Sequence, residues 1–69
     1  MTRTQAKRKL EAAKKTGRAR FYSETDKMTF DIWYDEDTKQ YSLSYRDGHY
    51  EQTVTVTYNP AKIEELIID

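Results

Sequence analysis

The residues best suited to binding alternate with apolar residues in segments rich in β-formers. Trp33 is the one tryptophan of the chain and occupies such a position within 28–34. Arg18, Arg20 and Tyr22 occupy similar positions in the segment before it. Because strand side chains point alternately to two faces, these residues are expected on the polar face of a sheet. An exposed tryptophan beside arginines is typical of an interface anchor.

Two other interpretations of Trp33 remain open at this point. The indole could serve as a stacking platform for unpaired bases. It could instead be half covered by the stems of Arg18 and Arg20 in a cross-strand cluster. In that case the tryptophan would belong to the fold and not to a binding site.

The carboxylates and the single histidine give weak evidence of catalysis. Asp31 and Glu51 are expected two strands apart in one transverse row, about 10 Å between backbones. A sheet face offers no cleft that excludes water, which paired-carboxylate chemistry needs. His49 could ligate a divalent ion with these carboxylates, but a lone histidine beside a turn is usually a solvated turn residue.

An acidic loop is expected between two strands, where Asp35, Glu36 and Asp37 follow one another. It lacks the spacing and the glycine of a calcium-binding loop. We therefore expect a soluble loop or a recognition tip for a basic partner. Phosphate-binding glycine motifs, paired histidines and cysteines are missing from the sequence. The sequence predicts no enzyme activity, no cofactor and no metal site.

Charge is distributed unevenly along the 69 residues, although 12 basic and 12 acidic side chains give a formal net charge of zero. Residues 1–20 hold most of the basic side chains and a single acid, Glu11. Such asymmetry is typical of a surface for nucleic acid or for an acidic partner. Attraction between helix and sheet within one fold would explain it as well. The candidate phosphate contacts are Lys7, Arg8, Lys14, Lys15, Arg18 and Arg20.

Hydrophobic spacing predicts the elements that would position these residues. Residues 2–16 are expected to form a helix, since Thr2 and Gln5 fit a capping box and Gly17 suits the left-handed position after a helix. Its apolar stripe is narrow and made mostly of small residues, namely Ala6, Leu10 and Ala13.

Period-two alternation over 18–58 predicts an antiparallel meander of four strands, or of three if 18–23 is frayed. The dipeptide Asp47-Gly48 favours a type I′ hairpin turn, which would pair Tyr45 with Tyr50. The loop at 35–40 would pair Tyr34 with Tyr41 and Ile32 with Leu43. The apolar face predicted by this register carries Phe21, Met28, Phe30, Ile32, Tyr34, Tyr41, Leu43, Tyr45, Tyr50, Val54, Val56 and Tyr58.

The same register predicts the rows of the polar face. One row would hold Arg18, Asp31, Ser44 and Glu51. A second would hold Arg20, Thr29, Arg46 and His49. Trp33 would share a third row with Ser42 and Thr53.

A second, short helix is predicted after the meander. Asn59 is a suitable N-cap and Pro60 suits the first helical position. Its stripe is expected to consist of Ile63, Leu66 and Ile67. Both helices need an apolar partner, so the predicted fold is α+β, one compact domain over 1–69 with the helices on one sheet face. Charged residues make up 35% of the chain, so we expect no membrane span, no secretory signal and an intracellular, cytoplasmic location.

The order of helix, meander and helix resembles the layout of double-stranded RNA-binding domains. That family reads phosphates with a lysine-rich start to its second helix. Here the helix begins Pro60-Ala61-Lys62 and continues Ile63-Glu64-Glu65, which repels phosphate.

A second resemblance is to small phage-encoded inhibitors of bacterial defence, the anti-CRISPR type. Gln5-Ala6-Lys7-Arg8 in the first helix and the tyrosine-rich meander from Met28 to Tyr58 are similar in style to these proteins. The resemblance covers the whole chain in size and layout, without a defining motif. It implies binding to a nucleoprotein complex in the host cell of a phage and blocking of its substrate or movement.

Three functional expectations follow. The first is a protein-binding regulator or inhibitor that acts by occlusion, with the contact residues Arg18, Arg20, Tyr22, Trp33, Arg46, His49, Asp35, Glu36 and Asp37. The second is nucleic-acid binding through the basic helix and the first strand. The third is self-association through an edge strand, 18–23 or 49–58, or through the C-terminal helices.

Overall fold

The computed structural model describes residues 1–68 of the chain. Helix α1 (Arg3–Thr16) precedes the four strands β1 (Arg18–Ser23), β2 (Met28–Asp35), β3 (Gln40–Asp47) and β4 (Tyr50–Thr57), and helix α2 (Pro60–Ile67) follows them. The strands form one antiparallel sheet in the order β1-β2-β3-β4. The predicted α+β meander is confirmed, and its first strand is part of the sheet.

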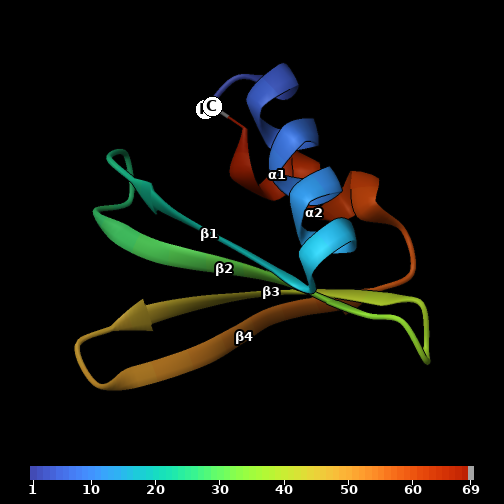
Figure 1. Ribbon diagram of the computed structural model, residues 1–69. Coiled ribbons are helices and arrows are strands. Elements are labelled where there is room, and N and C mark those ends of the chain that lie inside the picture. The colour runs from blue at the N-terminus through green and yellow to red at the C-terminus, as the bar shows by residue number, and fades with distance from the viewer. Residues whose placement is uncertain (69) are drawn as a thin grey trace.

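Both helices lie over the same face of the sheet, and no helix within residues 1–68 covers the other face (Figure 1). The core forms between them from both helices and the first three strands. Its buried members are Ala6, Leu10, Ala13, Ala19, Ile32, Tyr41, Leu43, Ile63 and Ile67. No residue of β4 belongs to this core, so one edge of the sheet extends beyond the cover of the helices.

Local signals fix the position of α1. The Thr2 side chain accepts a hydrogen bond from the Gln5 amide, and the Gln5 side chain accepts one from the Thr2 amide, which completes the predicted capping box. At the other end Gly17 has a φ of 95°, in the left-handed region that favours glycine. The Gly17 carbonyl accepts a hydrogen bond from the Tyr34 amide at 3.0 Å. The helix end is thereby tied directly to β2.

The registers of β1, β2 and β3 keep the predicted faces. Ile32 pairs with Leu43 and Tyr34 with Tyr41, as expected. The β1–β2 register differs by two residues from the prediction, because Arg18 lies opposite Trp33 and not opposite Asp31. A shift of two residues leaves every side chain on its predicted face and changes only its neighbours.

The β3–β4 hairpin departs further from prediction. Asp47 pairs with Tyr50, so the two central turn residues are Gly48 and His49. Only the first of them has a positive φ, 62° at Gly48, as a type II′ turn requires. The expected pair of Tyr45 and Tyr50 is therefore wrong.

A β-bulge between Leu43 and Ser44 also changes the faces of β4. Thr53 pairs with Ser44 and Thr55 with Leu43, which leaves Val54 as the extra residue. Beyond it Val56 pairs with Ser42, on the face opposite to the predicted one.

Several tyrosines and valines predicted for the apolar face are exposed as a result of this register and the missing helix cover. Tyr50 is 77% exposed and Tyr58 69% exposed. Val54 and Val56 are exposed too. Tyr50 keeps its predicted side of the sheet but is not buried there, whereas Val56 lies on the opposite side. The prediction that these four residues form part of a covered apolar face is therefore wrong.

The stripe of α2 is also only partly as predicted. Ile63 and Ile67 are buried, but Leu66 is exposed and Glu64 is buried in its place. The Glu64 carboxylate accepts a hydrogen bond from Arg3 Nη1 at 3.0 Å, and this ion pair joins the two helices.

Candidate functional site

The candidate site is the sheet face that the helices leave uncovered, which we call the open face. The pairings place its residues in three transverse rows. These rows are Arg18-Trp33-Ser42-Val56, Arg20-Asp31-Ser44-Thr53 and Tyr22-Thr29-Arg46-Glu51. All three differ from the predicted rows in their members, although every predicted residue of β1, β2 and β3 is on this face.

A buried carboxylate lies at the centre of the open face. Asp31 is 0% exposed although no helix within residues 1–68 covers this face. Arg20 donates from Nε to Asp31 Oδ1 at 2.9 Å, and Arg18 Nε lies 3.5 Å from the same oxygen. The two arginine side chains cover the carboxylate while they stay partly exposed themselves. Asp31 thus holds both guanidinium groups over the sheet surface.

The ion pair with Asp31 also changes the pKa of Arg20. The hydrogen bond to the Asp31 carboxylate, and then its charge, raise the pKa of Arg20 above the ordinary value for arginine. Among residues 1–68, no buried side-chain nitrogen or oxygen lacks a hydrogen-bond partner. The polar interior of the open face is therefore fully satisfied.

Trp33 is held in one orientation by contacts on two sides. The Arg18 guanidinium lies 5.0 Å from the centre of the indole ring, which is cation–π geometry. The indole Nε1–H donates to Ser44 Oγ at 3.2 Å, and the Ser44 hydroxyl donates to Glu51 at 3.2 Å. With these contacts Trp33 is still 38% exposed. It is both a member of a cross-strand cluster and accessible from outside.

The remaining predicted contact residues do not all join this face. Tyr22 and Arg46 lie on it, and both are exposed. His49 is in the β3–β4 turn, at one end of β3. The acidic residues 35–37 are at the other end of β3, near the β2–β3 turn. The structure therefore separates the predicted set into an open-face group and two turn regions.

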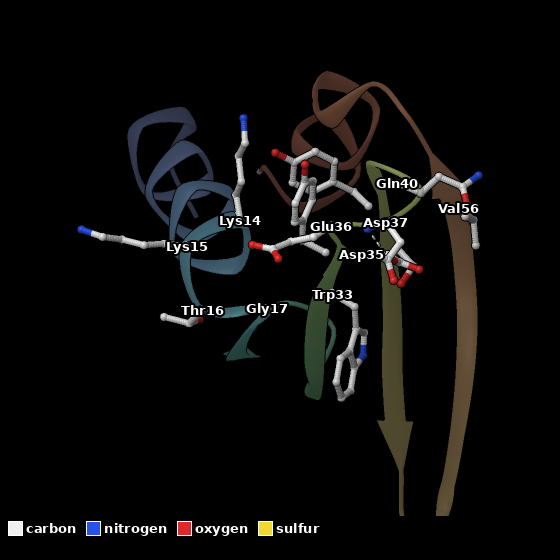
Figure 2. A pocket seen from close by; sticks show the side chains of 13 residues that line it. Lys14, Lys15, Thr16, Gly17, Trp33, Asp35, Glu36, Asp37, Gln40 and Val56 are labelled. Carbon is white, nitrogen blue, oxygen red and sulfur yellow. Dashed lines mark hydrogen bonds between the residues drawn. The ribbon is translucent and has the colours of Figure 1, made fainter.

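The acidic residues share a hollow with the basic end of α1. Asp35, Glu36 and Asp37 line this hollow of about 720 Å³ together with Lys14 and Lys15. Figure 2 shows that the Glu36 side chain points toward α1, whereas Lys15 points away from the hollow. Asp35 is oriented there by hydrogen bonds from the Asp37 and Thr38 amides. The acidic loop and the lysines at the end of α1, which were predicted as separate sites, therefore line the same hollow.

The candidate phosphate contacts are less free than the sequence suggested. Arg18 and Arg20 are engaged with Asp31. Lys7 and Lys14 line a groove between the helices that also contains Glu11 and Glu64. Lys7, Arg8, Lys14 and Lys15 remain exposed on α1. Carboxylates beside this helix reduce the positive potential of the group.

Sequence reasoning missed three features of the site: the burial of Asp31, the hydrogen bonds of Ser44, and the place of Val56 on the open face. The burial of Asp31 could have been found from the sequence. Asp31 is a carboxylate on the polar side of its strand, and the preceding strand carries Arg18 and Arg20 on its own polar side. The bulge that turns Val56 has no such signal, because bulges depend on how a whole strand fits its neighbour.

The comparisons with known proteins give no further guidance. No family model, no curated protein and no solved structure matches the chain. Within residues 1–68 no three His, Cys, Asp or Glu side chains are grouped so that they could hold a metal ion. In the same part of the chain, no helix has the length and apolar character needed to cross a membrane.

Proposed function

We propose that the protein is a small binding module without catalytic activity, which regulates or inhibits a protein partner by covering part of its surface. The open face is the contact surface, with Trp33 as the anchor. Arg18, Arg20 and Tyr22 flank it on β1, and Arg46 lies at the far end of the face.

The observation that carries this proposal is the fixed yet exposed indole of Trp33. Arg18 stacks on it and Ser44 accepts its N–H. A side chain already held in place loses little conformational entropy on binding, which favours affinity. Aromatic residues and arginines are also the residues that dominate protein interfaces.

The target we propose is a nucleoprotein complex of bacterial defence, following the resemblance in size and layout to anti-CRISPR-type inhibitors. A compact rigid surface suits occlusion, since the inhibitor needs only to occupy a site that a substrate or a moving part requires. The acidic residues 35–37 and His49 would form the rim of the contact at opposite ends of β3.

A pull-down with matched variants tests the proposal. We expect the wild-type chain to retain a partner from an extract of its native host and Trp33→Ala to lose it. Leu66→Ala, at an exposed apolar position on α2, should bind as wild type does. Circular dichroism must show that both variants are folded. Retention of the partner by folded Trp33→Ala, or its equal loss from Leu66→Ala, contradicts the choice of surface.

Nucleic-acid binding through α1 is the second candidate, favoured by the exposure of Lys7, Arg8, Lys14 and Lys15. Because Arg18 and Arg20 are engaged with Asp31, we expect contacts from these four residues at most. On duplex DNA this gives a log–log salt slope of about −3.6, at about −0.9 per phosphate. Titration of a DNA duplex at several salt concentrations measures it, and no binding at low salt rejects this candidate. Nuclease treatment of the pull-down eluate separates a direct protein partner from one bridged by nucleic acid.

A further inference from the structure

We propose that two copies of the chain associate edge to edge, with β4 of one copy antiparallel to β4 of the other. β4 ends the sheet on the side remote from α1 (Figure 1). Its outer backbone groups have no neighbouring strand within residues 1–68. Such an edge is a template for another strand. This inference goes beyond the proposed function and does not depend on it.

The composition of β4 leaves this edge with little protection. Charged residues, proline and β-bulges commonly blunt exposed edges. Of these, β4 has the charge of Glu51 and the bulge at Val54. Residues 53–57 are all threonine or valine, without charge or proline, and have high β-propensity. At the opposite edge, β1 is shorter and carries Arg18 and Arg20. β4 is therefore the edge more open to pairing.

The face pattern of β4 allows a two-fold pairing centred on the bulge residues Thr53 and Val54. On the N-terminal side of these two residues, Gln52 is on the helix side and Glu51 on the open face. On their C-terminal side, Thr55 is on the helix side and Val56 on the open face. Counted outward from Thr53 and Val54, the residues on both sides therefore alternate between the two faces in the same order.

A two-fold axis between Thr53 and Val54 uses this symmetry over the whole strand. It pairs the helix-side residues Gln52 with Thr55 and Tyr50 with Thr57 of the second copy. On the open face it pairs Glu51 with Val56, so no like charges lie opposite each other. Paired side chains must lie on one face of a continuous sheet, and all these pairs do. Thr53 and Val54, the residues at the bulge, lie next to the two-fold axis.

A second copy is the occupant we propose, because a closed two-fold contact requires a surface that complements itself, and this pairing sets Glu51, the one charged residue of β4, opposite the uncharged Val56. The formal net charge of zero means that no long-range repulsion separates two copies. The contact would cover Val54 and Val56, which are 44% and 54% exposed. It would also join the two open faces into one surface that carries both Trp33 side chains.

A charge-swap experiment at Val54 tests this arrangement, since the two Val54 side chains lie next to the axis. Sedimentation equilibrium of the wild-type chain over a wide concentration range should show an apparent mass rising toward twice that of one chain. Val54→Lys and Val54→Glu should each stay at the mass of one chain. An equimolar mixture of the two should regain the doubled mass. Leu66→Lys, a matched change on α2, should behave as wild type.

Three outcomes of the sedimentation experiment overturn the proposal. One is a wild-type chain that keeps the mass of one chain throughout. The second is a folded Val54→Lys variant that dimerises as well as wild type does. The third is loss of the dimer from Leu66→Lys alone, which would place the contact on α2. Amide chemical shifts of the wild type provide a test without any mutation: dilution should change those of residues 50–57 most, and a change centred elsewhere rejects the β4 contact.

Discussion

At the scale of single residues, Asp31 determines the character of the open face. It is a fully buried carboxylate without a helix above it, covered instead by the partly exposed Arg18 and Arg20. A buried charge is tolerated only where partners compensate for the lost hydration. Here the compensation comes from the same side chains that we propose as contacts for a partner. Under that proposal, structural and binding roles coincide in one cluster.

Replacement of Asp31 tests its structural role. Asp31→Asn retains the size of the side chain but directs an amide N–H₂ toward guanidinium donors and removes the charge-assisted bonds. We expect a loss of about 1–3 kcal/mol in the free energy of unfolding, measured by urea denaturation. Glu24→Gln, at an exposed turn position, is the control and should change stability little. Equal effects of the two substitutions would show that Asp31 is not held as described.

Tyr41 links stability to alkaline pH. Burial, and then the charge of Tyr34, raise the pKa of Tyr41 above its ordinary value. The folded chain then keeps the phenol proton at a pH where the unfolded chain releases it. The resulting stability is fully present below the unfolded pKa, about 10, and is lost as the pH rises through the higher folded pKa.

We expect urea denaturation to show falling stability above about pH 10, and Tyr41→Phe to show a weaker fall. Tyr22→Phe supplies the control, since it removes an exposed phenol. An unchanged pH dependence in Tyr41→Phe would contradict the role of burial at this position.

At the scale of elements, α1 is held close to the sheet by its small residues. Ala6 and Ala13 are 0% exposed, so no space is left at their methyl groups. Ala13→Leu should overpack this contact and lower the free energy of unfolding by about 1–3 kcal/mol. The adjacent Ala12 is exposed, and Ala12→Leu should be close to neutral. Thermal denaturation of the two variants gives the comparison, and similar melting temperatures would argue against the close approach of α1.

The same scale shows what the sequence could predict. Helix ends follow from local chemistry, as at Thr2 and Gly17, and alternation places β1, β2 and β3 correctly. The register of β4 depends on the turn type at Gly48 and on the bulge at Val54, which arise from the fit of two strands. One extra residue then exchanges the faces of the strand beyond it. Trp33 was therefore predicted on the correct face, whereas Val56, two strands away in the same row, was not.

At the scale of the whole molecule, the uneven charge is in part an internal arrangement. The basic end of α1 and the acidic residues 35–37 line the same hollow. Arg3 and Glu64 join the two helices, and Arg18 and Arg20 meet Asp31. The sequence left open whether its charges serve a partner or the fold. The three ion pairs show that several of these charges serve the fold.

Salt should therefore weaken the folded state. We expect the free energy of unfolding to fall by less than about 1 kcal/mol when sodium chloride is raised to high concentration, because exposed pairs contribute little each. The double variant Lys14→Gln, Lys15→Gln should be less sensitive to salt. Urea denaturation at low and high salt measures both. Stabilisation of the wild type by moderate salt would argue against attraction between α1 and the acidic loop.

Val54 is the one residue of β4 without a pairing partner on β3, so it can be deleted without a change in the pairing of the others. A chain without this residue would keep each of its cross-strand partners, from Tyr50 through Thr57. Strand β4 would lose the bend that the bulge introduces, and the outer edge of the sheet would be straight. Under the proposed contact between two copies, deletion of the Val54 codon would therefore favour self-association and leave the buried core, which contains no residue of β4, unchanged.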